Sequence, residues 1–202
     1  MRLLLVRHGK PETPGGSRAG NPPLSAEGHA QARGLRDFLK HEGIEGIVHS
    51  GMTRAADTAR PTVEALGLEP VVIEALGEVD RYGGDYANPE MVRARGQAEW
   101  TRFLGDPLGY FGIDQDRFVA ETLDGFGALF EAYHRRTIAI FTHGFPINIL
   151  LAHALGLPGI AHFVPGYGSI SRVSGRALDR LTVVSINETA HLAPAFARER
   201  AR

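Results

Sequence analysis

The chain has 202 residues, of which 43% are hydrophobic and 22% charged, and its formal net charge is −1. This balance is typical of a globular protein with a sizeable core, and no basic block points to a nucleic-acid partner. The chain has no cysteine, which excludes disulfides, a thiolate nucleophile and a thiolate zinc site. The apolar run over residues 3–6 is too short for a signal peptide or a membrane span, so we expect a cytoplasmic protein with no membrane partner.

Apolar runs and helical periodicities alternate along the chain. In chain order they predict a strand over 3–7, a Pro- and Gly-rich loop over 11–23, a helix capped by Ser25, a strand over 44–49, a helix from Thr53 that stops at Gly67, a strand over 71–73, an irregular segment over 80–117, a helix over 118–134, a strand over 138–141, a helix from Pro146 to Gly156 and a strand over 181–186.

Strands that alternate with helices are typical of a layered α/β domain with a mostly parallel sheet. No linker or internal repeat marks a second domain, so we predict one domain over residues 1–202. Pro61 lies inside a predicted helix, which it must kink or divide because proline cannot donate the backbone hydrogen bond.

Two histidines each follow a predicted strand and precede a glycine. His8 ends the first strand before Gly9, and His143 follows the strand over 138–141 before Gly144. Ligands of open α/β sheets bind beyond the carboxyl ends of the strands. The two imidazoles would therefore share one crevice if these strands are neighbours. The glycines allow a tight backbone turn beside a ligand.

The tripeptide Arg7-His8-Gly9 is the first of six blocks along the chain. The others are Pro23 to Ala32, Ser50 to Ala59, Leu76-Gly77-Glu78, Thr142-His143-Gly144 and Asn187 to Leu192. In their order and spacing, the six blocks resemble the histidine phosphatase superfamily, which includes the phosphoglycerate mutases. The resemblance implies a phosphoglycerate mutase-like fold, a three-layer α/β sandwich with a mostly parallel central sheet flanked by helices. It also makes residues 80–117 an irregular cap over the site.

The resemblance and the chemistry of phosphoryl transfer together give five residues a role. His8 is expected to attack phosphorus and form a phosphohistidine, with one ring nitrogen held protonated by a backbone carbonyl. Arg7 and Arg54 are expected to bind the phosphoryl oxygens, together with His8 and His143, and His143 donates as charge develops. Glu78 is expected to protonate the leaving oxygen and then to activate water. No cofactor or metal ion is expected.

Several residues compete with these assignments or carry none. Asp80, Asp85 and Glu74 are rivals of Glu78 as the acid because they lie close to it in sequence. His191 belongs to the closing block, where packing or hydrogen bonding is favoured over catalysis. Pro14 stands where the family often has an asparagine that touches phosphate.

The spacing of the blocks favours a phosphomonoester hydrolase that acts on a small phosphorylated metabolite. Glu78 and His143 lie 65 positions apart (143 − 78), and the resemblance implies a longer insertion here in mutases. Two alternatives stay open: a phosphoglycerate mutase-type phosphoryl transferase, and a noncatalytic phospho-ligand binding or regulatory module. The oligomeric state is also open, with a homodimer as one possibility.

Nine of the sixteen aromatic residues lie between residues 80 and 130. One interpretation is that the segment caps the site and selects an apolar or ring-bearing leaving group. The other is a small satellite core beneath irregular chain. Four arginines of this segment would either meet a second negative group or face water: Arg81, Arg93, Arg95 and Arg102.

Overall fold

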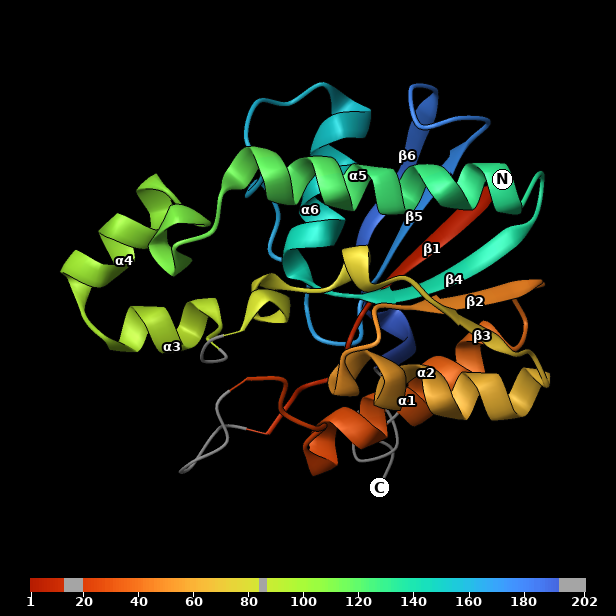
Figure 1. Ribbon diagram of the computed structural model, residues 1–202. Coiled ribbons are helices and arrows are strands. Elements are labelled where there is room, and N and C mark those ends of the chain that lie inside the picture. Colours follow the sequence, from red (N-terminus) through yellow and green to blue (C-terminus); the bar gives the residue numbers. More distant parts are fainter. Residues whose placement is uncertain (13–19, 84–86, 193–202) are drawn as a thin grey trace.

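A six-stranded sheet forms the centre of the computed structural model, which describes residues 1–12, 20–83 and 87–192 (Figure 1). The strand order is β3-β2-β4-β1-β5-β6. The strands are β1 (Arg2–Arg7), β2 (Gly46–His49), β3 (Pro70–Val72), β4 (Thr137–Thr142), β5 (Ile170–Gly175) and β6 (Leu181–Glu188). Strands β1 to β4 are parallel, and β5 pairs antiparallel with both β1 and β6, so β5 runs against the other strands.

Helices cover both faces of the sheet. The α-helices are α1 (Ala26–Leu39), α2 (Thr53–Leu66), α3 (Pro89–Ala94), α4 (Gln97–Gly105), α5 (Gln115–Ala132) and α6 (Gly144–Leu155). Short 3₁₀ turns are η1 (Glu74–Leu76), η2 (Val79–Tyr82), η3 (Gly109–Phe111) and η4 (Ala190–Leu192). Figure 1 shows α5 and α6 on one face and α1 and α2 on the other. Within the described residues, no helix is both long and apolar enough to cross a membrane.

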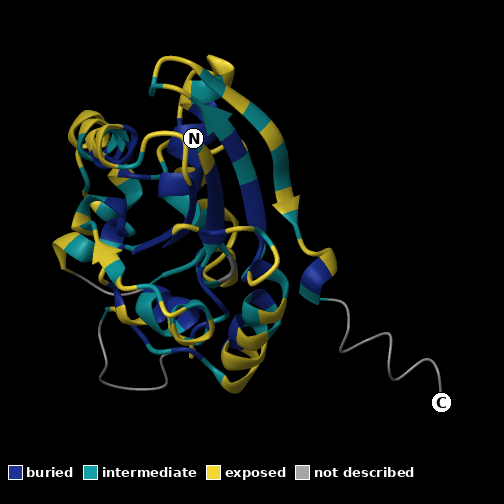
Figure 2. Ribbon diagram, turned by 90° about the vertical axis from the view of Figure 1, so that its right-hand side faces the viewer, coloured by how far each residue is buried: buried dark blue, intermediate teal, exposed yellow. Residues whose placement is uncertain are grey.

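Alternation along the central strands divides the core into two layers. Leu3 and Leu5 of β1 pack with Phe126 of α5 and Ile147 of α6, whereas Leu4 and Val6 pack on the opposite face. This follows because successive side chains of a strand point to opposite faces. Figure 2 shows the buried residues concentrated in the central strands, while the edge strand β6 has only half-buried and exposed positions. The predicted three-layer α/β sandwich is confirmed.

The parallel pairing of β1 with β4 positions the two histidines. Arg7 lies opposite Thr142 in the register, so His8 and His143 leave adjacent strands at the same edge of the sheet. The backbone N–H of His8 donates to Thr142 O over 2.9 Å, which extends the ladder one step beyond the strand. The strands that precede the two histidines are therefore neighbours, as a shared crevice requires.

Three elements differ from the sequence predictions. The segment over 80–117, predicted to be irregular, contains α3 and α4. Asn88 caps α3 by accepting from Met91 N, and Pro89 follows at the first helical position, where a missing N–H costs nothing. Strand β5 was not predicted. Helix α2 is continuous through Pro61, so of the two predicted effects of this proline the division of the helix does not occur.

Helix α1 packs closely against the loop that follows His8. Ser25 caps this helix as predicted, because its side chain accepts from Gly28 N, and its hydroxyl also donates to Lys10 O over 2.9 Å. A Cβ on Gly28 would lie 2.1 Å from Lys10 O, so only glycine fits there. The contact joins the start of α1 to the backbone two residues beyond His8.

We therefore expect Gly28→Ala to lower the free energy of unfolding by about 1–3 kcal/mol, because the added methyl displaces backbone. Gly34→Ala in the same helix is the matched control, since its Cβ would meet nothing nearer than 3.6 Å. That variant should gain up to about 1 kcal/mol from helix propensity. Urea denaturation of both variants measures the difference, and equal effects would contradict the proposed close contact.

Candidate active site

The buried His8 ring is held by its own loop. Its Nδ1 lies 2.8 Å from Gly9 O. A carbonyl oxygen can only accept, so Nδ1 carries the proton and Nε2 of the neutral ring carries the lone pair. The loop is fixed in turn, because Gly9 N donates to Thr58 Oγ1 over 2.9 Å and the Thr58 hydroxyl donates to Arg54 O over 2.6 Å. This arrangement leaves the lone pair of Nε2 available to a ligand.

The buried His143 ring faces His8. The two ring centroids lie 5.0 Å apart with the planes tilted by 53°. Nε2 of His143 lies 2.7 Å from the hydroxyl of Ser50, which follows β2. The backbone of Ser50 donates to Phe141 O of β4 over 3.3 Å. Three neighbouring strand ends, those of β1, β4 and β2, thus converge on the two imidazoles.

Arg7 approaches the same point from the last residue of β1. Its Nη1 donates to Pro165 O, and its guanidinium lies 4.1 Å above the Tyr167 ring. The Tyr167 ring is 5.5 Å from that of His8. Among the described residues, Arg7 Nε and His143 Nδ1 are buried without a hydrogen-bond partner. Such atoms are rare in proteins and are commonly satisfied by a ligand or by water.

Arg54 forms a buried ion pair with Asp80 of η2. Its two terminal nitrogens donate to the two carboxylate oxygens over 2.9 and 2.8 Å, and the side chains are only 0% and 2% exposed. Asp80 also accepts from Asn21 N over 3.1 Å, and Asn21 Oδ1 accepts from Thr53 N at the start of α2. Two parallel hydrogen bonds to one carboxylate fix the orientation of the Arg54 guanidinium.

Glu78 lies between η1 and η2, with its carboxylate at the start of α6. Oε2 accepts from Phe145 N and Oε1 from Val79 N, both over 3.2 Å. Burial raises the pKa of Glu78, and the nearby negative charge of Asp80 raises it further, whereas Arg54 opposes the shift. This carboxyl therefore keeps its proton to a higher pH than an ordinary glutamate does.

The pKa values of both histidines move in the opposite direction. Burial lowers the pKa of His8 well below its usual value, and the positive charges of Arg54 and Arg7 lower it further. Burial and then Arg54 lower the pKa of His143 in the same way. Both rings are therefore uncharged at neutral pH, as a nucleophile requires.

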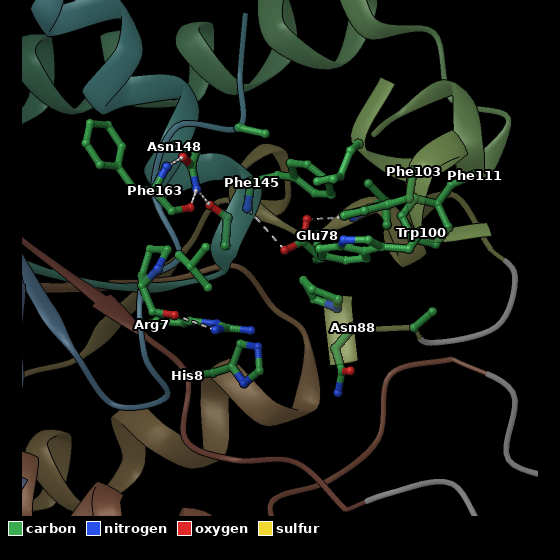
Figure 3. Close-up of a pocket in the computed structure, with 18 residues that line it drawn as sticks. Arg7, His8, Glu78, Asn88, Trp100, Phe103, Phe111, Phe145, Asn148 and Phe163 are labelled. Atoms are coloured by element: carbon green, nitrogen blue, oxygen red, sulfur yellow. Dashed lines mark hydrogen bonds between the residues drawn. The ribbon is translucent and has the colours of Figure 1, made fainter. Parts of the chain in front are cut away.

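A cavity of about 200 Å³ opens beside these groups (Figure 3). Arg7 and His8 line one end of it, and aromatic rings line the other. The remaining lining residues are Glu78, Val79, Ala87, Asn88, Pro89, Trp100, Phe103, Leu104, Phe111, Gly144, Phe145, Asn148, Ala161, Phe163, Val164 and Pro165. Figure 3 shows Glu78 between the His8 end and the rings of Trp100, Phe103 and Phe111.

The structure separates the other candidate residues from the cavity. Glu74 lines a different surface hollow with Arg81 and Glu121, and Asp80 is engaged by Arg54. Asp85 and Pro14 lie outside the described residues. Among the described residues, no group of three or more His, Asp or Glu side chains is arranged to hold a metal ion.

Other residues near the site had no clear sequence signal. Ser50 and Thr58 lie in the second arginine block, but nothing in the local pattern shows that they bind His143 Nε2 and Gly9 N. Tyr167 precedes the strand that was not predicted, so its position beside His8 was hidden as well. For His191, the predicted packing role is confirmed, since Nε2 lies 2.8 Å from Gly168 O and the ring contacts Phe38.

We expect Asp80→Asn to lower the free energy of unfolding by about 3 kcal/mol, because it leaves the fully buried Arg54 charge without its counterion. Asp37→Asn is the matched control, since Asp37 pairs with Arg36 at a position where its side chain is 56% exposed. That change should stay within about 0.5 kcal/mol. Urea denaturation at pH 7 measures both, and a small effect at Asp80 would show that the pair contributes little.

The lowered histidine pKa values also predict a pH dependence of stability. Below pH 6.5 the unfolded chain protonates His8 and His143 while the folded chain does not, so the free energy of unfolding falls as the pH falls. Each histidine contributes up to about 1.4 kcal/mol per pH unit. Denaturation at pH 7.5, 6.5 and 5.5 should therefore give a shallower slope for His143→Asn than for the wild type. Glu78, whose raised pKa acts in the opposite sense, is present in both proteins.

Several known proteins are similar in sequence to this chain over most of its length. A bifunctional protein of Mycobacterium tuberculosis is 32% identical over 162 residues, and the matched region is 76% of this chain but only 44% of that protein. A probable phosphoglycerate mutase of Proteus mirabilis is 28% identical, over 80% of this chain and 78% of the relative. An adenosylcobalamin/alpha-ribazole phosphatase of Salmonella typhimurium is 27% identical, over 81% and 85%.

Among solved structures, a phosphoserine phosphatase of Entamoeba histolytica superposes with a TM-score of 0.75 at 24% identity, and the match covers 95% of this chain and 98% of that one. This likeness concerns the fold. The family model of the histidine phosphatase superfamily (branch 1) matches residues 3–189, from the first strand to the closing block. The chain therefore belongs to the histidine phosphatase superfamily.

Proposed function

We propose that this chain is a phosphomonoester hydrolase that works through a phosphohistidine on His8 and needs no metal ion. The observation that carries the proposal is the hydrogen bond between His8 Nδ1 and Gly9 O, because it leaves Nε2 unprotonated at the end of a cavity. The neighbouring arginines and Glu78, whose pKa is raised by burial, supply the other requirements of phosphoryl transfer. A small phosphorylated metabolite is the substrate class that fits this cavity.

The first step forms a bond between Nε2 and phosphorus while the bond from phosphorus to the ester oxygen breaks. The Glu78 proton passes to the leaving oxygen, and an alcohol departs. In the second step the Glu78 carboxylate takes a proton from water, the water oxygen bonds to phosphorus and the N–P bond breaks. Inorganic phosphate leaves, and both residues return to their starting states.

Positive charge and hydrogen-bond donors stabilise the transferring group in both steps. Arg7 and Arg54 donate to the equatorial oxygens, and His143 lies 5.0 Å from the His8 ring, close enough to contact the same group. Asp80 keeps the Arg54 guanidinium in one orientation through two hydrogen bonds. These fixed groups take the part that a metal ion has in other phosphatases, so we infer that none is required.

We expect the protein to release p-nitrophenol from p-nitrophenyl phosphate with EDTA present throughout, and His8→Ala to abolish the release while the protein stays folded. His41→Ala, which removes an exposed histidine, should keep full activity. Turnover that EDTA abolishes and a divalent ion restores would contradict the metal-independent mechanism. Retained turnover in His8→Ala would contradict the phosphohistidine.

Glu78→Gln should separate the acid role from phosphate binding. With an alkyl phosphate, whose leaving oxygen needs a proton, we expect the rate of the first step to fall about 10²–10⁴-fold. With p-nitrophenyl phosphate, whose leaving group is already a stable anion, a burst of p-nitrophenol close to one per enzyme should precede slow hydrolysis. Tight phosphate binding without turnover in the wild type would instead indicate a binding module, and phosphoryl transfer between phosphoglycerates would indicate a mutase.

A further inference from the structure

We propose that the aromatic end of the cavity binds the leaving group of the phosphate ester, and that this group is an uncharged apolar ring rather than a carboxylate-bearing alcohol. The inference rests on the proposed function, which places the phosphoryl group at Arg7 and His8. The inference adds the chemical class of the alcohol that is released when the phosphoryl group is transferred.

The walls of the aromatic end come from three separate segments. Helix α4 supplies Trp100 and Phe103, whose rings stack with centroids 5.6 Å apart, and η3 supplies Phe111, edge-on to Phe103 at 6.0 Å. Phe145 at the start of α6 lines the same cavity. Offset and edge-on rings are the arrangement that receives another ring well.

Apolar side chains at the cavity also face water. Leu104 is 59% exposed and Val164 is 79% exposed, although both line the cavity. Large apolar side chains exposed beside a concave site are commonly covered when a ligand binds. A ring placed at this end would be covered by these residues as well.

The amide side chains that line the cavity are engaged within the protein. Asn148 donates to Gly144 O and Phe163 O and accepts from the backbone of His162 and Phe163, so its amide has no hydrogen-bonding capacity left. Asn88 accepts from Met91 N and donates to Tyr167. A polar leaving group would therefore lose its hydrogen bonds to water and gain few in return.

Four arginines of the segment over 80–117 contact neighbouring side chains, and none of the four lines the cavity. The guanidinium groups of Arg93 and Arg102 lie 5.8 and 5.4 Å from the rings of Trp100 and Tyr110. Arg95 donates to the Tyr110 hydroxyl, and Arg81 pairs with Glu121. Among the described residues that line the cavity, Arg7 and His8 are the ones whose side chains can carry a positive charge, and both lie at the phosphate end. A second negative charge would find no partner at the aromatic end.

The test compares three esters that share a primary alkoxide leaving group, so that differences report the cavity rather than leaving-group acidity. We expect kcat/KM for benzyl phosphate to exceed that for glycerol 1-phosphate and for 3-phosphoglycerate by about tenfold or more, as burial of one ring allows. Trp100→Ala should remove most of this preference through KM, while inhibition by inorganic phosphate stays unchanged. Phe38→Ala, which removes a ring that packs at His191 instead, is the control.

Trp100 also provides a readout without turnover, because it is the single tryptophan of the chain and lines the cavity. Benzylphosphonate should change its fluorescence and bind about tenfold more tightly than 2-carboxyethylphosphonate. A preference for 3-phosphoglycerate in a His8-dependent reaction would overturn the substrate class and leave the proposed function intact. No turnover of any ester, with benzylphosphonate still preferred, would overturn the proposed function and leave the cavity assignment intact. Equal binding of both phosphonates would overturn the cavity assignment.

Discussion

The parallel pairing of β1 with β4 is the constraint on which the rest of the site depends. Because Arg7 lies opposite Thr142, the next residue of each strand is a histidine at the same edge of the sheet. A slip of one residue would turn the apolar side chains of β1 to the wrong faces, so the buried core on both sides fixes the register. Strand β2 pairs with β4 on its other side and continues through Ser50 into α2, which carries Arg54. The sheet thus brings the polar residues that follow β1, β4 and β2 to one edge.

Burial of those polar groups has an electrostatic cost that the structure offsets unevenly. The Arg54 charge is compensated by Asp80, whereas the two histidines avoid the cost of burial by remaining uncharged. Glu78 avoids it by retaining its proton more strongly. The same burial that makes these groups unfavourable for folding therefore holds the pKa of Glu78 above its usual value and the pKa values of the two histidines below theirs.

The sequence predicted what repeats locally and missed what depends on distant partners. Strands β1, β2 and β4 were predictable because each is a nearly continuous apolar run, and the His-Gly pairs that follow β1 and β4 marked the site. Strand β5 reads Ile170-Ser171-Arg172-Val173, with too few apolar residues to stand out, and its pairing with β1 stabilises it. Helices α3 and α4 were not predicted because glycines and prolines interrupt their sequence. Asn88-Pro89, an N-cap followed by proline at the first helical position, is nevertheless a pattern typical of a helix start. The pairing of Asp80 with Arg54 joins residues 26 positions apart and has no local signature.

The fully occupied amide of Asn148 has a consequence for how the binding cavity of this protein can diversify. The amide of Asn148 donates to the backbone of Phe163 and of Gly144, the first residue of α6. Phe145, which follows Gly144, donates its backbone N–H to Glu78. The α6 wall of the cavity and the position of the Glu78 carboxyl therefore depend on the same helix end, so a substitution that reshapes this wall also disturbs the carboxyl. The α4 wall has no such bond to Glu78 among those described. Substitutions at Trp100 or Leu104 can therefore change which groups the cavity binds without disturbing Glu78. Substitutions on the α6 side affect both the cavity wall and the Glu78 carboxyl.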